Sequence, residues 1–252
     1  MANPKLERES AAASGESAGS TEVERLRVEV HAIYPHDPSA FTQGLVWDGG
    51  VLYESTGLYG KSSLRRVEPM SGEVLERRMV DPNLFGEGLA QVDDKLVQLT
   101  WKAGIALVYD LATLYQVDEF GFNGEGWGLA YDGESLMMSD GSHRLTERDR
   151  NDFRWRATIE VRLHGQPVDH LNELEFAEGD LYANVWGEDR IVRIDPSSGR
   201  VTAVIDASGL LTPFEKSRVD VLNGIAYDPV SKTFWLTGKF WAKMFQVTFV
   251  PA

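Results

Sequence analysis

The side chains in this sequence that could do chemistry stand at the first position of five short, similar motifs. The motifs read Gln43-Gly44-Leu45, Glu87-Gly88-Leu89, Trp127-Gly128-Leu129, Asn172-Glu173-Leu174 and Asn223-Gly224-Ile225. Their first residues are one carboxylate, one indole and three amides. A carboxylate can move protons, and amide groups can hydrogen-bond a reacting carbonyl oxygen. The motifs therefore predict a polar site, provided that the fold brings their first residues together.

A second set of residues stands at a fixed distance beyond each motif. The distance is 14 positions in four motifs and 16 in the fifth, where the turn "DPVSK" is two residues longer. The residues reached in this way are Gly57, Trp101, Gly141, Trp186 and Lys239. Two further indoles and one ammonium group are thus expected beside the first set.

The elements that must position these side chains form a repeat. Successive motifs are separated by 44, 40, 45 and 51 residues, and a period near 45 is typical of propellers and solenoids. Each motif is followed by a turn and by further strand-like segments, three of them in each of the first four repeats. Four strands per repeat is the pattern of a propeller blade. The sequence predicts an all-β fold, a five-bladed propeller of four-stranded blades over residues 25–252. A two-sheet sandwich is the less favoured alternative.

The fifth repeat ends before a fourth strand is available. The segment 26–34, "LRVEVHAIY", alternates as a strand should and precedes the first motif. We expect it to pair with "KMFQVTF" at 243–249 and to close the ring, which removes the open edge of the last blade. Helical patterns are scarce, and only 210–220 is expected to hold a helical turn.

In a blade the innermost strand lines the central channel and the second strand runs back beside it. The start of the first strand and the end of the second therefore lie at one end of the ring, so that both sets of residues meet at one channel mouth. Each residue also has an ordinary explanation. A tryptophan can pack between blades, Lys239 can be a solvated charge, and Glu87 can cap a turn. For Asn223 we favour a hydrogen bond to loop backbone.

Composition narrows the possible partners. The chain of 252 residues carries a formal net charge of −14, which opposes binding to nucleic acid or anionic lipid. It has no cysteine, and its five histidines lack metal-ligand spacing, so we predict no metal and no cofactor. No apolar run is long enough to span a membrane. Residues 1–24 are expected to be a disordered tail or linker without a signal peptide.

Several motifs together resemble a known family. "FTQGL", "FGEGLA", "LTWK", "GEGWGLA", "LNELE", "ANVWGE" and "LNGIA…LTGK" occur in order between Tyr34 and Phe249. The set resembles the plant and bacterial type of glutaminyl-peptide cyclotransferase. The resemblance implies a five-bladed propeller that converts the N-terminal glutamine of a peptide to pyroglutamate and releases ammonia. The pocket residues it implies are Gln43, Glu87, Trp101, Trp127, Asn172, Trp186 and Lys239, with Phe41 nearby.

The resemblance also suggests where the chain acts and on what. Members of the family are often exported, so a periplasmic or secreted location is expected. The implied partners are peptides or proteins with an N-terminal glutamine, and we expect a monomer. A calcium ion has been associated with the channel of the plant proteins, but the sequence identifies no ligands for it here.

The mechanism that we expect assigns a role to each pocket residue. Glu87 takes a proton from the α-amine and delivers it to the leaving nitrogen, and Lys239 and Asn172 hold the γ-carbonyl oxygen as it becomes negative. Gln43 orients the α-amine, and the three tryptophans enclose the aliphatic stem and exclude water.

Two rival functions remain open from the sequence. One is a metal-dependent lactonase with Glu87, Asn172 and Asn223 as ligands to calcium, which leaves the tryptophans and Lys239 without a task. The other is a scaffold that binds peptides without catalysis.

Overall fold

The computed structural model describes residues 22–252, and these residues form an all-β structure, as the sequence predicts. The predicted tail at residues 1–24 lies almost entirely outside the described part of the chain. A single short helix, α1 (Pro213–Lys216), falls within the segment expected to be helical. Thr212 and Glu215 form a reciprocal capping box at its start, and Pro213 occupies the first turn, where a missing N–H costs nothing.

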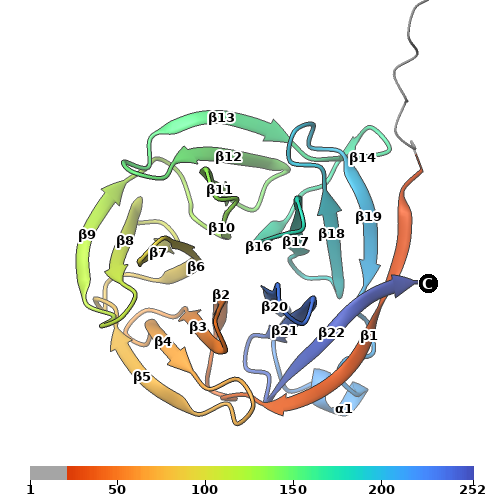
Figure 1. Ribbon diagram of the computed structural model, residues 1–252, viewed down its shortest axis with the longest axis horizontal. Coiled ribbons are helices and arrows are strands. Elements are labelled where there is room, and N and C mark those ends of the chain that lie inside the picture. Colours follow the sequence, from red (N-terminus) through yellow and green to blue (C-terminus); the bar gives the residue numbers. More distant parts are fainter. Residues whose placement is uncertain (1–21) are drawn as a thin grey trace, which may run out of the picture.

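Most strands belong to meandering four-stranded sheets or to one larger sheet (Figure 1). The first sheet contains β2 (Thr42–Asp48), β3 (Val51–Thr56), β4 (Ser63–Val67) and β5 (Val74–Met79). The second contains β6 (Gly86–Val92), β7 (Lys95–Thr100), β8 (Ile105–Asp110) and β9 (Gln116–Gly121). The third contains β10 (Leu129–Tyr131), β11 (Ser135–Ser139), β12 (Arg144–Asp149) and β13 (Trp155–Glu160). A two-stranded hairpin pairs β14 (Arg162–Leu163) with β15 (Gln166–Pro167).

The remaining strands form one eight-stranded mixed sheet. Their order across the sheet is β16 (Leu171–Ala177), β17 (Asp180–Val185), β18 (Arg190–Ile194), β19 (Val201–Asp206), β1 (Glu24–Pro35), β22 (Lys243–Pro251), β21 (Thr233–Gly238) and β20 (Leu222–Asp228). The expected antiparallel pairing of the N-terminal strand with the C-terminal one is present between β1 and β22.

The prediction of a five-bladed propeller with separate four-stranded blades is wrong in its sheet arrangement. At its start, β1 also pairs in parallel with β19, from Glu24 opposite Ala203 to Arg27 opposite Asp206. This pairing joins the predicted fourth and fifth blades into the eight-stranded sheet. The physical reason is that β1 is 12 residues long and exposes backbone groups on both sides. The sequence pattern predicted one partner strand for β1. The second edge of β1 pairs with β19, whose edge would otherwise be open.

The sheets are arranged around a central axis, with β2, β6, β10, β16 and β20 innermost (Figure 1). Neighbouring sheets pack through apolar side chains on their facing surfaces. Leu64 of the first sheet and Leu96 of the second, for example, are completely buried in one shared cluster. The axis is thus lined by the starts of five strands, and these are the segments that carry the five motifs.

Candidate functional site

One pocket gathers every residue for which the sequence predicts a catalytic or binding role. It has a volume of about 170 Å³ and is lined by Phe41, Gln43, Phe85, Glu87, Trp101, Trp127, Asn172, Trp186 and Lys239. This is smaller than the pockets that usually hold drug-sized ligands. The pocket is therefore suited to a single side chain with its backbone amine, and not to a whole peptide.

Irregularities in the inner strands aim the motif residues at this pocket. The pairing register of β2 with β3 shifts between Thr42 and Gly44, so that Gln43 lies at a bulge. Equivalent shifts fall across the motifs of β6, β16 and β20. A bulge redirects a side chain and ends regular pairing, and this accounts for the recurrence of the motif.

The glycine at the second motif position permits the inner strands to approach one another. A Cβ atom on Gly44 would overlap the backbone of Leu89, and one on Gly128 would overlap the carbonyl of Asn172. Neighbouring motifs are therefore in backbone contact, and the first residues of the motifs are held close together.

Glu87 is the buried acid of the pocket. Its side chain is 5% exposed, and its Oε1 accepts a hydrogen bond of 3.0 Å from Gln43 Nε2. Within residues 22–252 its other oxygen has no hydrogen-bond donor. Burial raises the pKa of Glu87 well above its ordinary value; the positive charge of Lys239 opposes this shift, and the negative charge of Glu125 adds to it. Glu87 is thus a carboxyl group that keeps its proton to higher pH than an ordinary glutamate.

Lys239 is a buried ammonium group without an ion-pair partner in the described part of the chain. It is 5% exposed, and its Nζ lies 4.7 Å from the centroid of the Phe41 ring. Burial lowers the pKa of Lys239, while Glu87 and Asp220 act in the opposite direction. Its hydrogen-bond donors are therefore available to a ligand.

The two asparagines of the motifs differ in their bonding. Asn223 Nδ2 donates to the carbonyl oxygen of Thr42 at 3.0 Å and to Gln43 Oε1 at 3.1 Å, as expected for a residue that bonds backbone. Asn223 does not line the pocket. Asn172 does line it, and its Oδ1 is buried without a hydrogen-bond partner in the described chain. The Oδ1 of Asn223 also lacks a partner within residues 22–252, but only the side chain of Asn172 faces the pocket, where a ligand could reach it.

The sequence analysis missed two residues of the site. Phe85 packs edge-on against Trp101, with ring centroids 5.5 Å apart. Glu125 lies at the rim, where its Oε2 accepts hydrogen bonds from the indole N–H of Trp101 at 2.7 Å and of Trp127 at 3.1 Å. A signal was present in the sequence, because Glu125 stands between two glycines just as Glu87 does.

The comparisons with known proteins agree with this geometry. The sequence model of the glutamine cyclotransferase family matches residues 5–249. The chain is also 42% identical over 241 residues to the glutaminyl-peptide cyclotransferase of Arabidopsis thaliana, a match that covers 92% of this chain and 75% of the plant protein. The chain belongs to the glutamine cyclotransferase family.

A solved structure supports the assignment to the glutamine cyclotransferase family. The crystal structure of Myxococcus xanthus glutaminyl cyclase matches this chain with a TM-score of 0.84 and 37% sequence identity. The match covers 92% of this chain and 100% of the bacterial one. The relatives therefore span nearly the whole folded region, including all of the pocket.

Two observations bear on metals and membranes. Among residues 22–252 no three histidine, cysteine, aspartate or glutamate side chains are grouped so that they could hold a metal ion. Asn223, one of the ligands in the rival lactonase hypothesis, does not line the pocket that holds Glu87 and Asn172. In the same part of the chain, no helix has the length and apolar character needed to cross a membrane.

Proposed function

We propose that this chain is a glutaminyl-peptide cyclotransferase in which Glu87 carries the proton that the reaction must move. The reaction converts the N-terminal glutamine of a peptide to pyroglutamate and releases ammonia. The observation that carries the proposal is the buried carboxyl of Glu87. Within residues 22–252 one of its oxygens has no hydrogen-bond donor, and it shares a pocket with Lys239, which has no ion-pair partner there.

The reaction is an intramolecular acyl transfer. The α-amine nitrogen of glutamine forms a bond to the γ-carbonyl carbon, and the bond from that carbon to the amide nitrogen breaks. One proton leaves the attacking amine and one is gained by the departing nitrogen, so that the sum is a lactam and ammonia. Because both reacting groups belong to one residue, the enzyme has to fold that residue, stabilise the charge and relay the proton.

Glu87 is suited to the relay because a single carboxyl can accept the first proton and donate it again. Gln43 fixes Oε1 at 3.0 Å and leaves the second oxygen for the substrate. Burial raises the pKa of Glu87 and so brings it closer to the ordinary pKa of the α-amine, which is about 7.7–8.0. A smaller pKa difference makes transfer in both directions efficient.

Lys239 and Asn172 are the proposed donors to the γ-carbonyl oxygen. Both line the pocket, and neither side chain is committed to another group within residues 22–252. In a site from which water is excluded, donors of this kind stabilise the developing negative charge more strongly than they would in water. Gln43, held by Asn223 and bonded to Glu87, is placed to orient the α-amine.

The aromatic side chains form the walls of the pocket and its exit. Trp127 and Trp186 meet edge to face with ring centroids 6.3 Å apart, and Trp186 is 42% exposed. The stem of the glutamine packs against these rings, and the rest of the peptide leaves past Trp186 into solvent. We therefore expect little selectivity beyond the first residue. The monomeric state and export from the cytoplasm stay predictions.

The test is incubation of the purified protein with a peptide that begins with glutamine. The expected products are a peptide lighter by one ammonia and an equal amount of free ammonia. The same peptide with an acetylated α-amine should not react, because the nucleophile is blocked. Binding without ammonia release would support a peptide-binding scaffold instead, and ammonia release with conversion to glutamate would show hydrolysis.

A further inference from the structure

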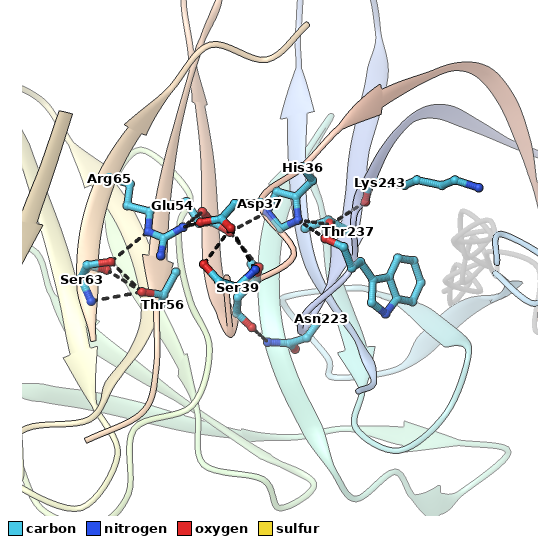
Figure 2. A network of polar contacts seen from close by, with 12 residues as sticks. His36, Asp37, Ser39, Glu54, Thr56, Ser63, Arg65, Asn223, Thr237 and Lys243 are labelled. Carbon is cyan, nitrogen blue, oxygen red and sulfur yellow. Dashed lines mark hydrogen bonds and ion pairs between the residues drawn. The ribbon is translucent and has the colours of Figure 1, made fainter. Parts of the chain in front are cut away.

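A network of polar side chains links the segment before β2 to strands β3, β4 and β21 (Figure 2). At its centre is His36, which lies between the end of β1 and the start of β2 and is 5% exposed. The network connects this segment to Glu54 of β3, Arg65 of β4 and Thr237 of β21. None of these residues lines the pocket.

The hydrogen bonds of His36 indicate a doubly protonated ring. Nδ1 lies 2.7 Å from the carbonyl oxygen of Trp241, which can only accept, so this nitrogen carries a proton. Nε2 lies 2.8 Å from Glu54 Oε1. Glu54 also accepts a hydrogen bond from Thr42 Oγ1 at 2.7 Å, and Arg65 lies 3.5 Å from its other oxygen. With Glu54 ionised, both ring nitrogens of His36 are donors.

His36 shares the network with two carboxylates and two arginines. Glu54 of β3 and Asp37 face the imidazole, Arg65 of β4 pairs with both carboxylates, and Arg77 of β5 lies 3.6 Å from Asp37. Burial by itself lowers the pKa of His36, but the charge and hydrogen bond of Glu54 outweigh it and the net direction is upward. This direction agrees with the two acceptors at the ring nitrogens, and both favour the imidazolium.

Two segments that supply pocket residues meet at this network. The segment 36–43 brings Phe41 and Gln43, and the turn 238–241 brings Lys239. The His36 ring bonds the carbonyl oxygen of Trp241. In addition, the backbone N–H of Phe240 donates a hydrogen bond to the carbonyl oxygen of Ala40 at 2.7 Å.

The far side of the turn is held by hydrogen bonds to residues 220–221. Lys239 exchanges backbone hydrogen bonds with Asp220 and Val221, at 3.0 Å each. The position of Lys239 in the pocket therefore depends on contacts from both sides. From the 36–43 segment, His36 supplies a side-chain hydrogen bond to the turn, and the ring of Phe41 packs against Phe240 with centroids 5.1 Å apart.

We propose that His36 is a positioning residue that, as an imidazolium, fastens the Lys239 turn to the segment carrying Phe41 and Gln43. The inference rests on the proposed function, since its consequence is the placement of the Lys239 ammonium against the γ-carbonyl oxygen. Removing the ring takes away one of the contacts that hold the turn to this segment and loosens the turn, and a shift of about 1 Å can cost up to about 10²-fold in rate.

Kinetics of His36→Gln test the role. We expect kcat for a glutamine-initiated peptide to fall by about 10–10²-fold at a temperature where thermal unfolding shows the variant to be folded. The matched control is His31→Gln, since His31 is exposed and bonds only Thr248, and its kcat should equal that of the wild type.

A double-mutant cycle separates positioning from a general structural effect. If His36 acts through Lys239, the loss caused by His36→Gln should shrink to less than about threefold in a Lys239→Met background. An equal loss in both backgrounds would overturn the proposal. If the wild type forms pyroglutamate and His36→Gln does so at the same rate, the positioning role is wrong but the proposed function stands. If the wild type releases no ammonia, the proposed function is wrong and the positioning role with it.

The protonation state is measurable in the wild type, even if His36→Gln does not fold. Nuclear magnetic resonance of the assigned His36 ring should show protons on both nitrogens from pH 6 to about pH 8, above the ordinary histidine pKa of about 6.5. A ring that is neutral at pH 7 would overturn the proposal.

Discussion

Two buried glutamates of the inner strands, Glu87 of β6 and Glu173 of β16, differ in how their oxygens are bonded. Both lie within bulged motifs, and burial raises the pKa of each well above its ordinary value. Glu173 Oε1 accepts the backbone N–H of Leu45 at 3.1 Å, and its Oε2 accepts that of Ile225 at 3.0 Å. The carboxyl of Glu87, by contrast, accepts one hydrogen bond within residues 22–252, from Gln43.

The difference shows that a shifted pKa does not by itself identify a catalytic acid. Glu173 stands at the second motif position, where the other four motifs have glycine, and it joins β16 to β2 and β20 across the axis. Both of its oxygens are used, so it has none left for a substrate. Glu87 keeps one oxygen free and faces the pocket. Satisfied hydrogen bonds thus separate a structural carboxyl from a reactive one.

The largest effect expected from this comparison is that of Glu87→Gln. The amide keeps the shape and can still accept the bond from Gln43, but it cannot take up a proton. We expect kcat to fall by roughly 10²–10⁴-fold. Steady-state ammonia release measures this loss, and thermal unfolding should show a melting temperature close to that of the wild type. A variant with activity near that of the wild type would remove Glu87 from the proton relay.

The second largest effect is that of Lys239→Met, which keeps the length of the side chain and removes its charge. Loss of a donor to the developing oxyanion should lower kcat by roughly 10²–10³-fold. Because the ammonium lowers the pKa of Glu87, its removal should also move the acid limb of the pH–rate profile to higher pH. A limb that stays in place would mean that the two groups do not interact.

Glu173→Leu should affect stability instead of chemistry. The substitution leaves the backbone N–H groups of Leu45 and Ile225 without an acceptor. Each buried unpaired donor lowers the free energy of unfolding by about 1–3 kcal/mol. In a chain of this size, each kcal/mol lowers the melting temperature by roughly 2–4 °C. Calorimetry measures the change, while kcat per folded molecule should stay near the wild-type value. A large loss of kcat in a fully folded variant would erase the distinction between the two glutamates.

The smallest effect expected is that of Glu125→Gln. The negative charge of Glu125 helps to raise the pKa of Glu87, so its removal should move the acid limb to lower pH, opposite to Lys239→Met. A glutamine can still accept the indole hydrogen bonds, and kcat at the optimum should change little. The pH dependence of kcat measures the shift. A shift in the same direction as that of Lys239→Met would contradict the assigned charges.

The sequence predicted the strands and the pocket well, because both follow from a repeated local pattern. The motif spacing placed Glu87, Trp101 and Lys239 in one site without any knowledge of the contacts between sheets. The sheet arrangement was less accessible. The parallel pairing of Glu24–Arg27 with β19 joins two segments that are far apart in the sequence. Alternating side chains identify a strand but do not identify its second partner.

The residues that the sequence did not reveal act through other side chains. Glu125 holds two indoles by their N–H groups, and this depends on where Trp101 and Trp127 lie in space. His36 was considered only as a metal ligand, for which sequence spacing is informative. Its actual partners are Glu54 of β3 and Trp241 of the turn between β21 and β22, and no spacing rule connects them.

The most direct test of the account is the pH dependence of kcat for the wild type and for Glu87→Gln. The account requires an ionised Glu87 to begin the reaction, so the wild type should lose activity as the pH falls through a value clearly above the ordinary glutamate pKa of about 4.3. The residual activity of Glu87→Gln should lack this limb. An acid limb at the same pH in both proteins would contradict the account, because it would show that another group carries the proton.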